Sequence, residues 1–184
     1  DVVVTGSAQV AGFFLSFGAA DLNLGGAAGN DGANSRFVFE IAGSKGAREL
    51  SFASGTSIND IVAAVNSFTE VTGVKATVSG TGVTLKSTAF GGDELVSVRV
   101  VDHGALNTAQ ATAGVYKFET ADTNTASTAA PDRTLFSAAN NKITDLGQNV
   151  SATINGIVAT IKGKVARINT DFLDVEINLK SGTG

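Results

Sequence analysis

The chain has 184 residues, of which 43% are hydrophobic, and its formal net charge is −4 at pH 7. It contains no cysteine, which excludes disulfides, thiolate metal sites and cysteine nucleophiles. The acidic balance disfavours nucleic acid as a partner, and no apolar run reaches the roughly 20 residues of a membrane helix.

Two stretches near the N-terminus have the character of buried strands. They are residues 2–4 and residues 13–17, and several glycines separate them. The sequence leaves open whether residues 1–35 pack with the first half of the chain or with the last. Because the chain begins with Asp1 and not with methionine, we expect it to be a segment of a longer polypeptide.

A hairpin and a helix are predicted next. Residues 37–41 and 48–52 are joined by a glycine-containing turn at 43–46, which indicates an antiparallel pair. Ser57 is placed to cap a helix that runs from Ile58 to about Val71, and Gly73 is placed to end it. The helix carries one apolar stripe, made of Ile58, Ile61, Val62, Val65 and Phe68.

Three strands are expected after this helix. Residues 74–79 and 83–88 alternate apolar and polar side chains on either side of a turn at 80–82. Residues 95–101 form a third strand after Gly91 and Gly92. Their order predicts a meander in which each strand pairs with the next.

The pattern weakens in the following region and recovers near the end. Residues 103–141 read as loop around one strand at 115–119, and residues 126–133 are the expected protease-sensitive segment. The dipeptide Asn155-Gly156 predicts a hairpin between 150–154 and 157–161. A closing strand is expected to bury the face formed by Phe172, Val175, Ile177 and Leu179. Its opposite face, exposed to solvent, carries Asp174, Glu176 and Asn178.

These elements place the chain in the α+β class. We expect mainly antiparallel β-sheet and hairpins, with one short helix packed on a strand face. Residues 1–184 form one domain or two lobes, the first at 1–103 with the helix and the second at 104–184 with a variable loop and the hairpin block.

Few residues suggest chemistry. His103 is the only histidine and adjoins Asp102, but the local sequence supplies neither the nucleophile nor the metal that a catalytic pair needs. Asp171, Asp174 and Glu176 form the densest acidic group, which fits a solvated strand face better than a calcium site or a pair of glycosidase carboxylates.

Two glycine-rich stretches are also weak candidates. Residues 21–25 begin like a calcium loop, yet position twelve of that loop is Gly32 and not glutamate. The pairs Gly25-Gly26 and Gly91-Gly92 lack the spacing of a phosphate-binding loop. We therefore predict no catalytic, cofactor-binding or metal-binding residues.

Residues 55–101 resemble the repeat found in the variable central region of bacterial flagellins and in other proteins of the flagellar axis. That repeat has a short helix containing an aspartate, an alanine and a final asparagine, then Thr-Gly-Val, a strand pair and an aromatic-glycine step. The matching positions are Ser57, Asp60, Ile61, Ala64, Val65, Asn66, Thr72, Gly73, Val74, Leu85, Phe90, Gly91 and Val96. Residues 146–156 and 167–170 resemble a second block of the same proteins.

The resemblance implies a structural, surface-exposed outer domain of a flagellar filament subunit, outside the cell, that presents the antigenic face of the filament. It implies neighbouring flagellin subunits as partners, with host receptors, antibodies or glycans as further binders, and no nucleic acid or membrane insertion. It also implies no enzyme activity and no cofactor. Residues 120–128 are candidates for O-glycosylation, and we expect the isolated chain to be monomeric and unable to form filaments.

Two alternatives stay open at this stage. The helix-containing repeat also resembles segments of the flagellar cap and hook-associated proteins. A carbohydrate-binding or adhesive module is the other alternative, although the chain has no tryptophan and only one tyrosine, Tyr116, on which a sugar ring stacks.

Overall fold

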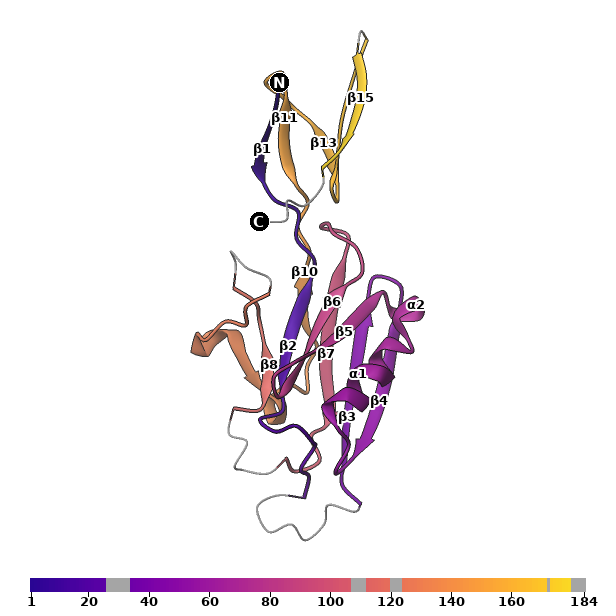
Figure 1. The fold of residues 1–184 in the computed structure, drawn as a ribbon, viewed down its shortest axis with the longest axis vertical. Helices are drawn as coiled ribbons and strands as arrows, with labels where there is room; N and C mark the ends of the chain where they lie inside the picture. The colour runs from indigo at the N-terminus through magenta and orange to yellow at the C-terminus, as the bar shows by residue number, and fades with distance from the viewer. Residues whose placement is uncertain (26–33, 107–111, 120–123, 172, 180–184) are drawn as a thin grey trace.

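The computed structural model describes residues 1–25, 34–106, 112–119, 124–171 and 173–179. The molecule is elongated, with a larger body and a smaller body arranged end to end (Figure 1). The chain starts in the smaller body, builds the larger body, and then returns to complete the smaller one.

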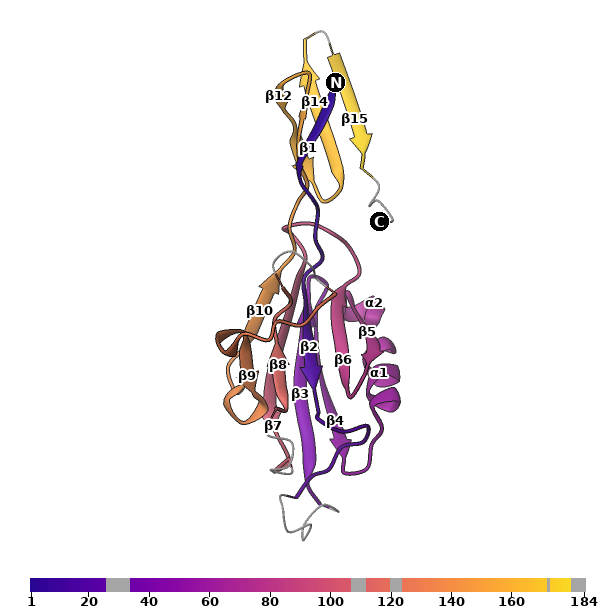
Figure 2. The same cartoon turned by 60° about the vertical axis from the view of Figure 1, so that its left-hand side comes forward.

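Two antiparallel sheets form the larger body, and both are seen in Figure 2. The first sheet has the order β10 (Ile143–Leu146), β7 (Leu95–Asp102), β3 (Arg36–Gly43) and β4 (Ala47–Ala53). The second has the order β5 (Val74–Ser79), β6 (Gly82–Ser87), β2 (Gly12–Ser16), β8 (Gly114–Tyr116) and β9 (Arg133–Leu135). Two short 3₁₀ helices, η2 (Ala130–Asp132) and η3 (Phe136–Ala138), flank β9.

Phenylalanine rings fill the core of the larger body. Alternation along β3 directs Phe37 and Phe39 inward, and both side chains are fully buried. The ring of Phe37 lies 5.3 Å from that of Phe17 and 4.9 Å from that of Phe136, measured between centroids. Both contacts are edge-on, an arrangement that aromatic quadrupoles favour.

The expected helix is present, but it is interrupted. In α1 (Ile58–Asn66), Ser57 Oγ accepts a hydrogen bond from the Asp60 backbone N–H at 3.2 Å, which confirms the cap. The chain leaves helical geometry at Phe68, whose φ is −109°, and α2 (Thr69–Thr72) follows. The single helix to Val71 was therefore wrong. The Ser67 hydroxyl donates to the Ala64 carbonyl at 2.7 Å, a local bond of the kind that competes with helix continuation.

The meander prediction was right for two strands and wrong for the third. β5 and β6 pair as expected, with Val78 opposite Val83. β7 pairs instead with β3 and β10 in the other sheet. Alternation shows which face of a strand is buried but not which strand it pairs with, and the turn at Gly91, with φ of 126°, carries the chain across.

The region 103–141 contains more structure than the sequence pattern indicated. β9, η2 and η3 lie within it, and β8 is shorter than the strand expected at 115–119. Within the expected protease-sensitive segment, the buried Ser127 donates its hydroxyl to Asp132 at 2.8 Å and its N–H to the Lys117 carbonyl at 2.8 Å.

The smaller body has two three-stranded sheets. The first sheet has the order β1 (Val2–Gly6), β11 (Ser151–Ile154) and β12 (Ile157–Val158). The second has the order β13 (Thr160–Lys162), β14 (Val165–Thr170) and β15 (Leu173–Asn178). A small apolar cluster lies between them, made of Ala152, Ile154, Ala159, Ala166 and Ile168. Positive φ angles at Asn155 (52°) and Gly156 (79°) confirm the predicted turn.

The hairpin after this turn is shorter than predicted. Only Ile157 and Val158 pair back to β11, because residues 160–162 pair with β14 instead. In β15, Val175 and Ile177 are half-buried while Asp174 and Glu176 are exposed, as expected, and Phe172 lies outside the described residues.

The fold class is confirmed as α+β, mainly antiparallel sheet with a short helix packed on strands β5, β6 and β4. The sheets group the chain differently from sequence-order lobes at 1–103 and 104–184. β1 pairs with β11 in the smaller body, whereas β2, only six residues further on, lies between β6 and β8 in the larger one.

Ile61 tests how much the larger body depends on α1. Its side chain is fully buried, so Ile61→Ala should lower the free energy of unfolding by roughly 2–5 kcal/mol through lost contacts and a residual cavity. Val71→Ala is the control, because Val71 is 42% exposed and its truncation should cost no more than about 0.5 kcal/mol. Urea denaturation of both variants measures the difference, and equal losses would contradict the packing role of α1.

Candidate functional site

Two chain segments cross between the bodies side by side. The Gln9 N–H donates to the Gln148 carbonyl at 2.8 Å, and the Gln148 N–H donates to the Gln9 carbonyl at 3.0 Å. The Gln148 side-chain amide also donates to the Ser7 carbonyl at 3.1 Å. The connection is therefore a two-stranded antiparallel bridge and not a single linker.

The side chain of Asn149 joins this bridge to both bodies. Its Oδ1 accepts hydrogen bonds from the Gly92 N–H at 3.0 Å and from the Gly163 N–H at 2.9 Å. Gly92 belongs to the loop before β7, while Gly163 belongs to the turn between β13 and β14. One amide oxygen thus holds a loop of each body, and the Lys164 ammonium lies 3.5 Å from the centre of the Phe90 ring beside it.

Glycines allow the backbones to approach closely at this junction. A Cβ on Gly147 would lie 2.4 Å from the Gly91 carbonyl oxygen and 2.8 Å from that of Gln9. Gly163, with φ of 57°, would place a Cβ 2.8 Å from the Phe90 carbonyl oxygen. Gly91-Gly92 is accordingly a packing element, and the Gly92 N–H that a phosphate would need is already bonded to Asn149.

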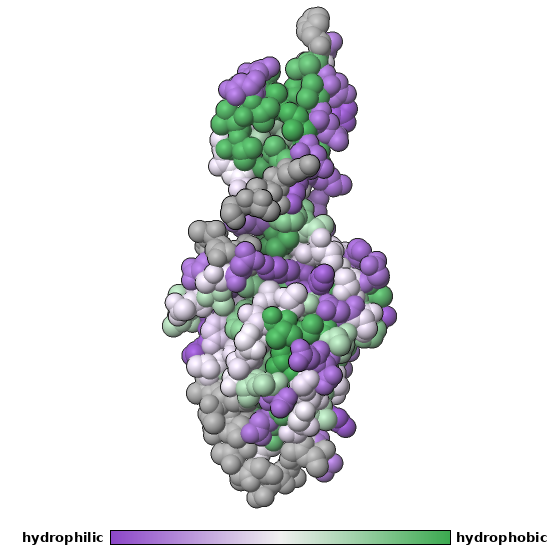
Figure 3. Space-filling view, in the orientation of Figure 1, coloured by the Kyte–Doolittle hydropathy of each residue, from purple (hydrophilic) through white to green (hydrophobic). Residues whose placement is uncertain are grey.

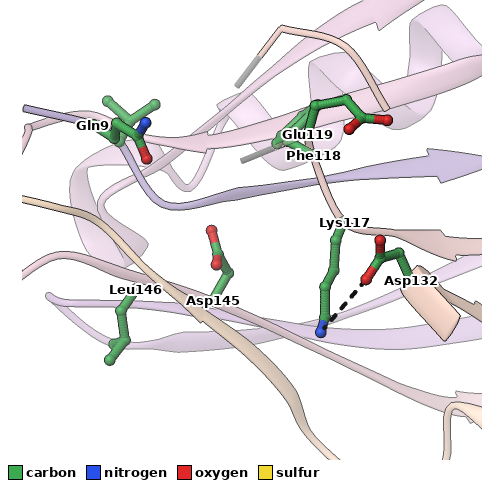
Figure 4. Close-up of a pocket in the computed structure, with 8 residues that line it drawn as sticks. Gln9, Lys117, Phe118, Glu119, Asp132, Asp145 and Leu146 are labelled. Atoms are coloured by element: carbon green, nitrogen blue, oxygen red, sulfur yellow. Dashed lines mark ion pairs between the residues drawn. The ribbon is translucent and has the colours of Figure 1, made fainter. Parts of the chain in front are cut away.

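A polar cleft of roughly 300 Å³ lies near the junction, between β10 and the chain that follows β8. Figure 4 shows the Asp145 carboxylate pointing into it between Gln9 and Lys117. Lys117 forms an ion pair with Asp132 at 3.9 Å across one side. The cleft is therefore lined by one ion pair and two further carboxylate residues, Asp145 and Glu119.

Asp145 links the two sheets of the larger body. Its Oδ2 accepts a hydrogen bond from the Gly12 N–H, at the start of β2, at 2.8 Å. Burial raises the pKa of the Asp145 carboxyl, against the backbone N–H groups of Gly12 and Leu146 and the charge of Lys117, which lower it. The arrangement is that of a structural carboxylate, since nothing in the described part of the cleft is placed as a nucleophile for it to activate.

The structure places the histidine candidate at the end of a strand. Asp102 Oδ1 accepts from the Gly104 N–H at 2.8 Å, and the Gly104 carbonyl accepts from the Gly25 N–H at 3.0 Å. Asp102 therefore stabilises the turn after β7, and no hydrogen bond from it to His103 is seen in the described residues.

The acidic candidates of the smaller body include an ion pair. Arg167 donates to both carboxylate oxygens of Asp174, at 3.0 and 2.7 Å, and this hydrogen bonding lowers the pKa of Asp174. Glu176 lies opposite Arg167 across the β14–β15 pair, and Asp171 is exposed. Across the described residues, no three histidine, cysteine, aspartate or glutamate side chains come together as metal ligands.

Residues 21–25 serve packing. Asp21 pairs with Ser57 through a single β-bridge, and Leu22 and Leu24 are buried in the core. Gly26 and Gly32 lie outside the described residues, as does the 120–123 part of the expected glycosylation segment. Of the rest of that segment, Ser127 is buried.

Tyr116, the candidate sugar platform, lies against the protein. Its ring is 6.1 Å from that of Phe14, and its hydroxyl donates to the Thr112 carbonyl at 2.6 Å.

The sequence reasoning missed the residues that hold the junction. Gly147 and Asn149 stand inside the second block that it recognised, but nothing in their spacing shows that they contact Gly91 and Gly163. Asp145 gave no signal, because its strand β10 was not predicted.

The model of the flagellin hook IN motif matches residues 36–89, which run from β3 past β6. This match confirms the flagellin-type repeat expected from the sequence. No curated protein matches the chain by sequence. No helix among the described residues has both the length and the apolar character needed to span a membrane.

Two solved structures of the D2–D3 domains of the flagellar cap protein FliD from Serratia marcescens are similar to this chain. The match to the first has a TM-score of 0.55 and 19% identity, and it spans 99% of the present chain and 85% of the FliD chain. The second, in another crystal form, has a TM-score of 0.49 and 16% identity, with 99% and 86% coverage. The first likeness shows a shared fold, and with the motif it supports a structural protein of the flagellum.

Gly147 tests the close packing of the junction. Gly147→Ala should destabilise the protein by about 1–3 kcal/mol, because its Cβ would meet backbone oxygen at 2.4 Å. Gly92→Ala is the matched control, since its Cβ would meet nothing closer than 3.5 Å. Amide hydrogen exchange at Gly163 should accelerate only in Gly147→Ala. Equal exchange in both variants would show that the junction tolerates the extra volume.

Asp145 gives a pH-dependent test. Its folded-state pKa is raised, so the folded state binds the proton more tightly than the unfolded state does. Asp145 therefore makes its whole contribution to the free energy of unfolding at pH values below its pKa in the unfolded state. This contribution is lost as the pH rises through its pKa in the folded state. As the pH is lowered from 7 to 4, the free energy of unfolding of the native chain, measured by urea denaturation, should rise relative to that of Asp145→Asn. A difference that stays constant with pH would contradict this prediction.

Proposed function

We propose that the chain is the outer, two-body part of a flagellar cap protein. The observation that carries this proposal is the extent of the fold likeness, which covers 99% of this chain and 85% of the FliD D2–D3 chain and so includes both bodies. This departs from the filament subunit that the sequence indicated first and favours the cap alternative. The flagellin hook IN motif fits either protein, because it marks the larger body alone.

The proposed role is mechanical and needs no catalytic residue. The larger body is stabilised by aromatic packing between two sheets. The smaller body is held to it by the Gln9–Gln148 backbone pair and by the Asn149 side chain. A load applied to one body is therefore transmitted through the bridge at Gln9 and Gln148 and through Asn149. We place the protein outside the cell on the flagellum, with neighbouring flagellar subunits as its partners.

The filament-subunit hypothesis is the second candidate. It rests on the block at 146–156, whose Asn155-Gly156 turn is formed as the flagellin resemblance implies. Carbohydrate binding has less support, because the Tyr116 ring packs on Phe14 and its hydroxyl is already bonded to the backbone.

Immunogold electron microscopy separates the two candidates. Antibodies raised against the 184-residue chain are applied to intact flagella of the source bacterium. We expect gold at the distal tip of each filament and nowhere along it. Labelling along the whole filament would overturn the cap proposal in favour of a filament subunit, and labelling at the hook would indicate a hook-associated protein.

Two controls make this experiment decisive. Serum absorbed with the purified chain should lose all labelling, which shows that the signal comes from this protein. Serum against the filament subunit itself should label the filament along its length, which shows that the surface is accessible to antibody.

A further inference from the structure

Sheet edges in the larger body are protected against pairing with another chain. On β5, the Asn66 side chain donates to the Ala76 carbonyl at 3.0 Å and accepts from the Ala76 N–H at 2.8 Å, so it occupies the place of a neighbouring strand. β4 carries the exposed charges of Arg48 and Glu49. Charges on an edge disfavour pairing because a partner strand would have to bury them.

The remaining edges are short or charged. β9 has three residues and begins with Arg133, and β10 carries Asp145. In the smaller body, β15 exposes Asp174 and Glu176, β13 has three residues and ends in Lys162, and β12 has two residues.

β12 is also uncharged, with Ile157 53% and Val158 79% exposed, but it has only two residues, whereas β1 is an uncharged edge of five. Val2, Val3 and Val4 are consecutive, uncharged and 41%, 46% and 48% exposed. β11 pairs with one side of β1, and no strand in the described part of the chain pairs with the other side. The register shift of this strand lies between Val4 and Gly6, so the three valines themselves are regular. Figure 3 shows hydrophobic side chains gathered on this smaller body.

The outward hydrogen-bonding groups of β1 can be assigned. The Asn155 N–H donates to the Asp1 carbonyl at 2.8 Å, so the backbone groups of Asp1 point toward β11 and its turn. Backbone groups alternate in direction along a strand, which turns those of Val3 toward β11 as well. The N–H and C=O groups of Val2 and Val4 therefore point away from the sheet, where a further strand would bind.

We propose that β1 pairs antiparallel with β1 of a second copy of this chain, about a two-fold axis at Val3. Val2 of one copy then lies opposite Val4 of the other, and these two residues exchange their free N–H and C=O groups. Val3 lies opposite its own equivalent in a non-hydrogen-bonded pair, where side chains approach most closely. The two three-stranded sheets become one continuous six-stranded sheet across the axis.

A second copy fits this edge because the edge is self-complementary. In this register each valine lies opposite a valine, and β-branched side chains pack well against cross-strand neighbours on a pleated surface. The valines carry no charge that would select a partner of opposite sign. The contact is isologous, so it closes at two copies and does not propagate into a fibre. The inference replaces the monomer expected from the sequence, and it is independent of the proposed flagellar role.

A single cysteine tests the register. The chain has no cysteine, so Val3→Cys introduces one thiol per copy. Opposed residues of a non-hydrogen-bonded pair have Cα atoms about 4.5 Å apart, within the roughly 4.4–6.8 Å range of disulfides. Under mild oxidation, Val3→Cys should convert to a disulfide-linked dimer. The matched control Val78→Cys, at a site with the same 46% exposure, should stay largely monomeric.

Sedimentation equilibrium tests the association without a cross-link. The native chain and Val3→Thr should shift from monomer toward dimer as concentration rises, and Val3→Lys should lose this shift because two like charges would face each other on the axis. Val3 is 46% exposed, and circular dichroism will check that each variant is folded. A native chain that stays monomeric at every concentration, or a shift retained in Val3→Lys, would overturn the proposal.

Mixing variants identifies the partner strand. If Val3→Cys cross-links to Val158→Cys on β12 as readily as to itself, the contact is heterologous and the two-fold pairing is wrong. Equal oxidation rates for Val3→Cys and Val78→Cys, or growth beyond dimers, would also overturn it.

Discussion

The antiparallel pair of Gln9 and Gln148 is the constraint on which the rest of the molecule depends. It joins positions 139 residues apart, so it fixes where the chain leaves the smaller body and where it returns. With these two points aligned, β1 meets β11 on one side of the bridge and β2 enters the middle of a sheet on the other. The glycines at 91, 147 and 163 let the backbones approach, and Asn149 joins the two loops that meet there.

The two bodies achieve stability by different means. The larger body buries phenylalanines between two sheets, and this apolar core needs no covalent crosslink in a chain without cysteine. The smaller body has a core made mostly of alanine and isoleucine, which supplies much less apolar area. Its strands rely more on backbone pairing, and the Arg167–Asp174 ion pair on its surface is exposed and adds little.

What could be predicted from the sequence was local. The cap at Ser57, the stripe containing Ile61 and the turn at Asn155 each depend on residues a few positions apart, and their side-chain chemistry specifies them. Partners far apart were not predictable, because alternation in β7 shows a buried face but no neighbour. The same limit hid the junction, whose Gly147–Gly91 contact leaves no trace in either segment taken alone. Asn66 combines the two cases. Its position in the repeat could be recognised from the local sequence, but its hydrogen bonds to the edge of β5, where it takes the place of a neighbouring strand, could not.

Protection of edges in the larger body and its absence on β1 follow a common physical logic. A protein that stands among many copies of itself is exposed to unwanted strand pairing at every open edge. Asn66 solves this on β5 without a charge, since a carboxamide supplies one donor and one acceptor at the spacing of a backbone pair. In this chain, that contact gives a physical role to the asparagine at the end of α1. If β1 pairs as we propose, blocked edges on the larger body direct association by strand pairing to the smaller body.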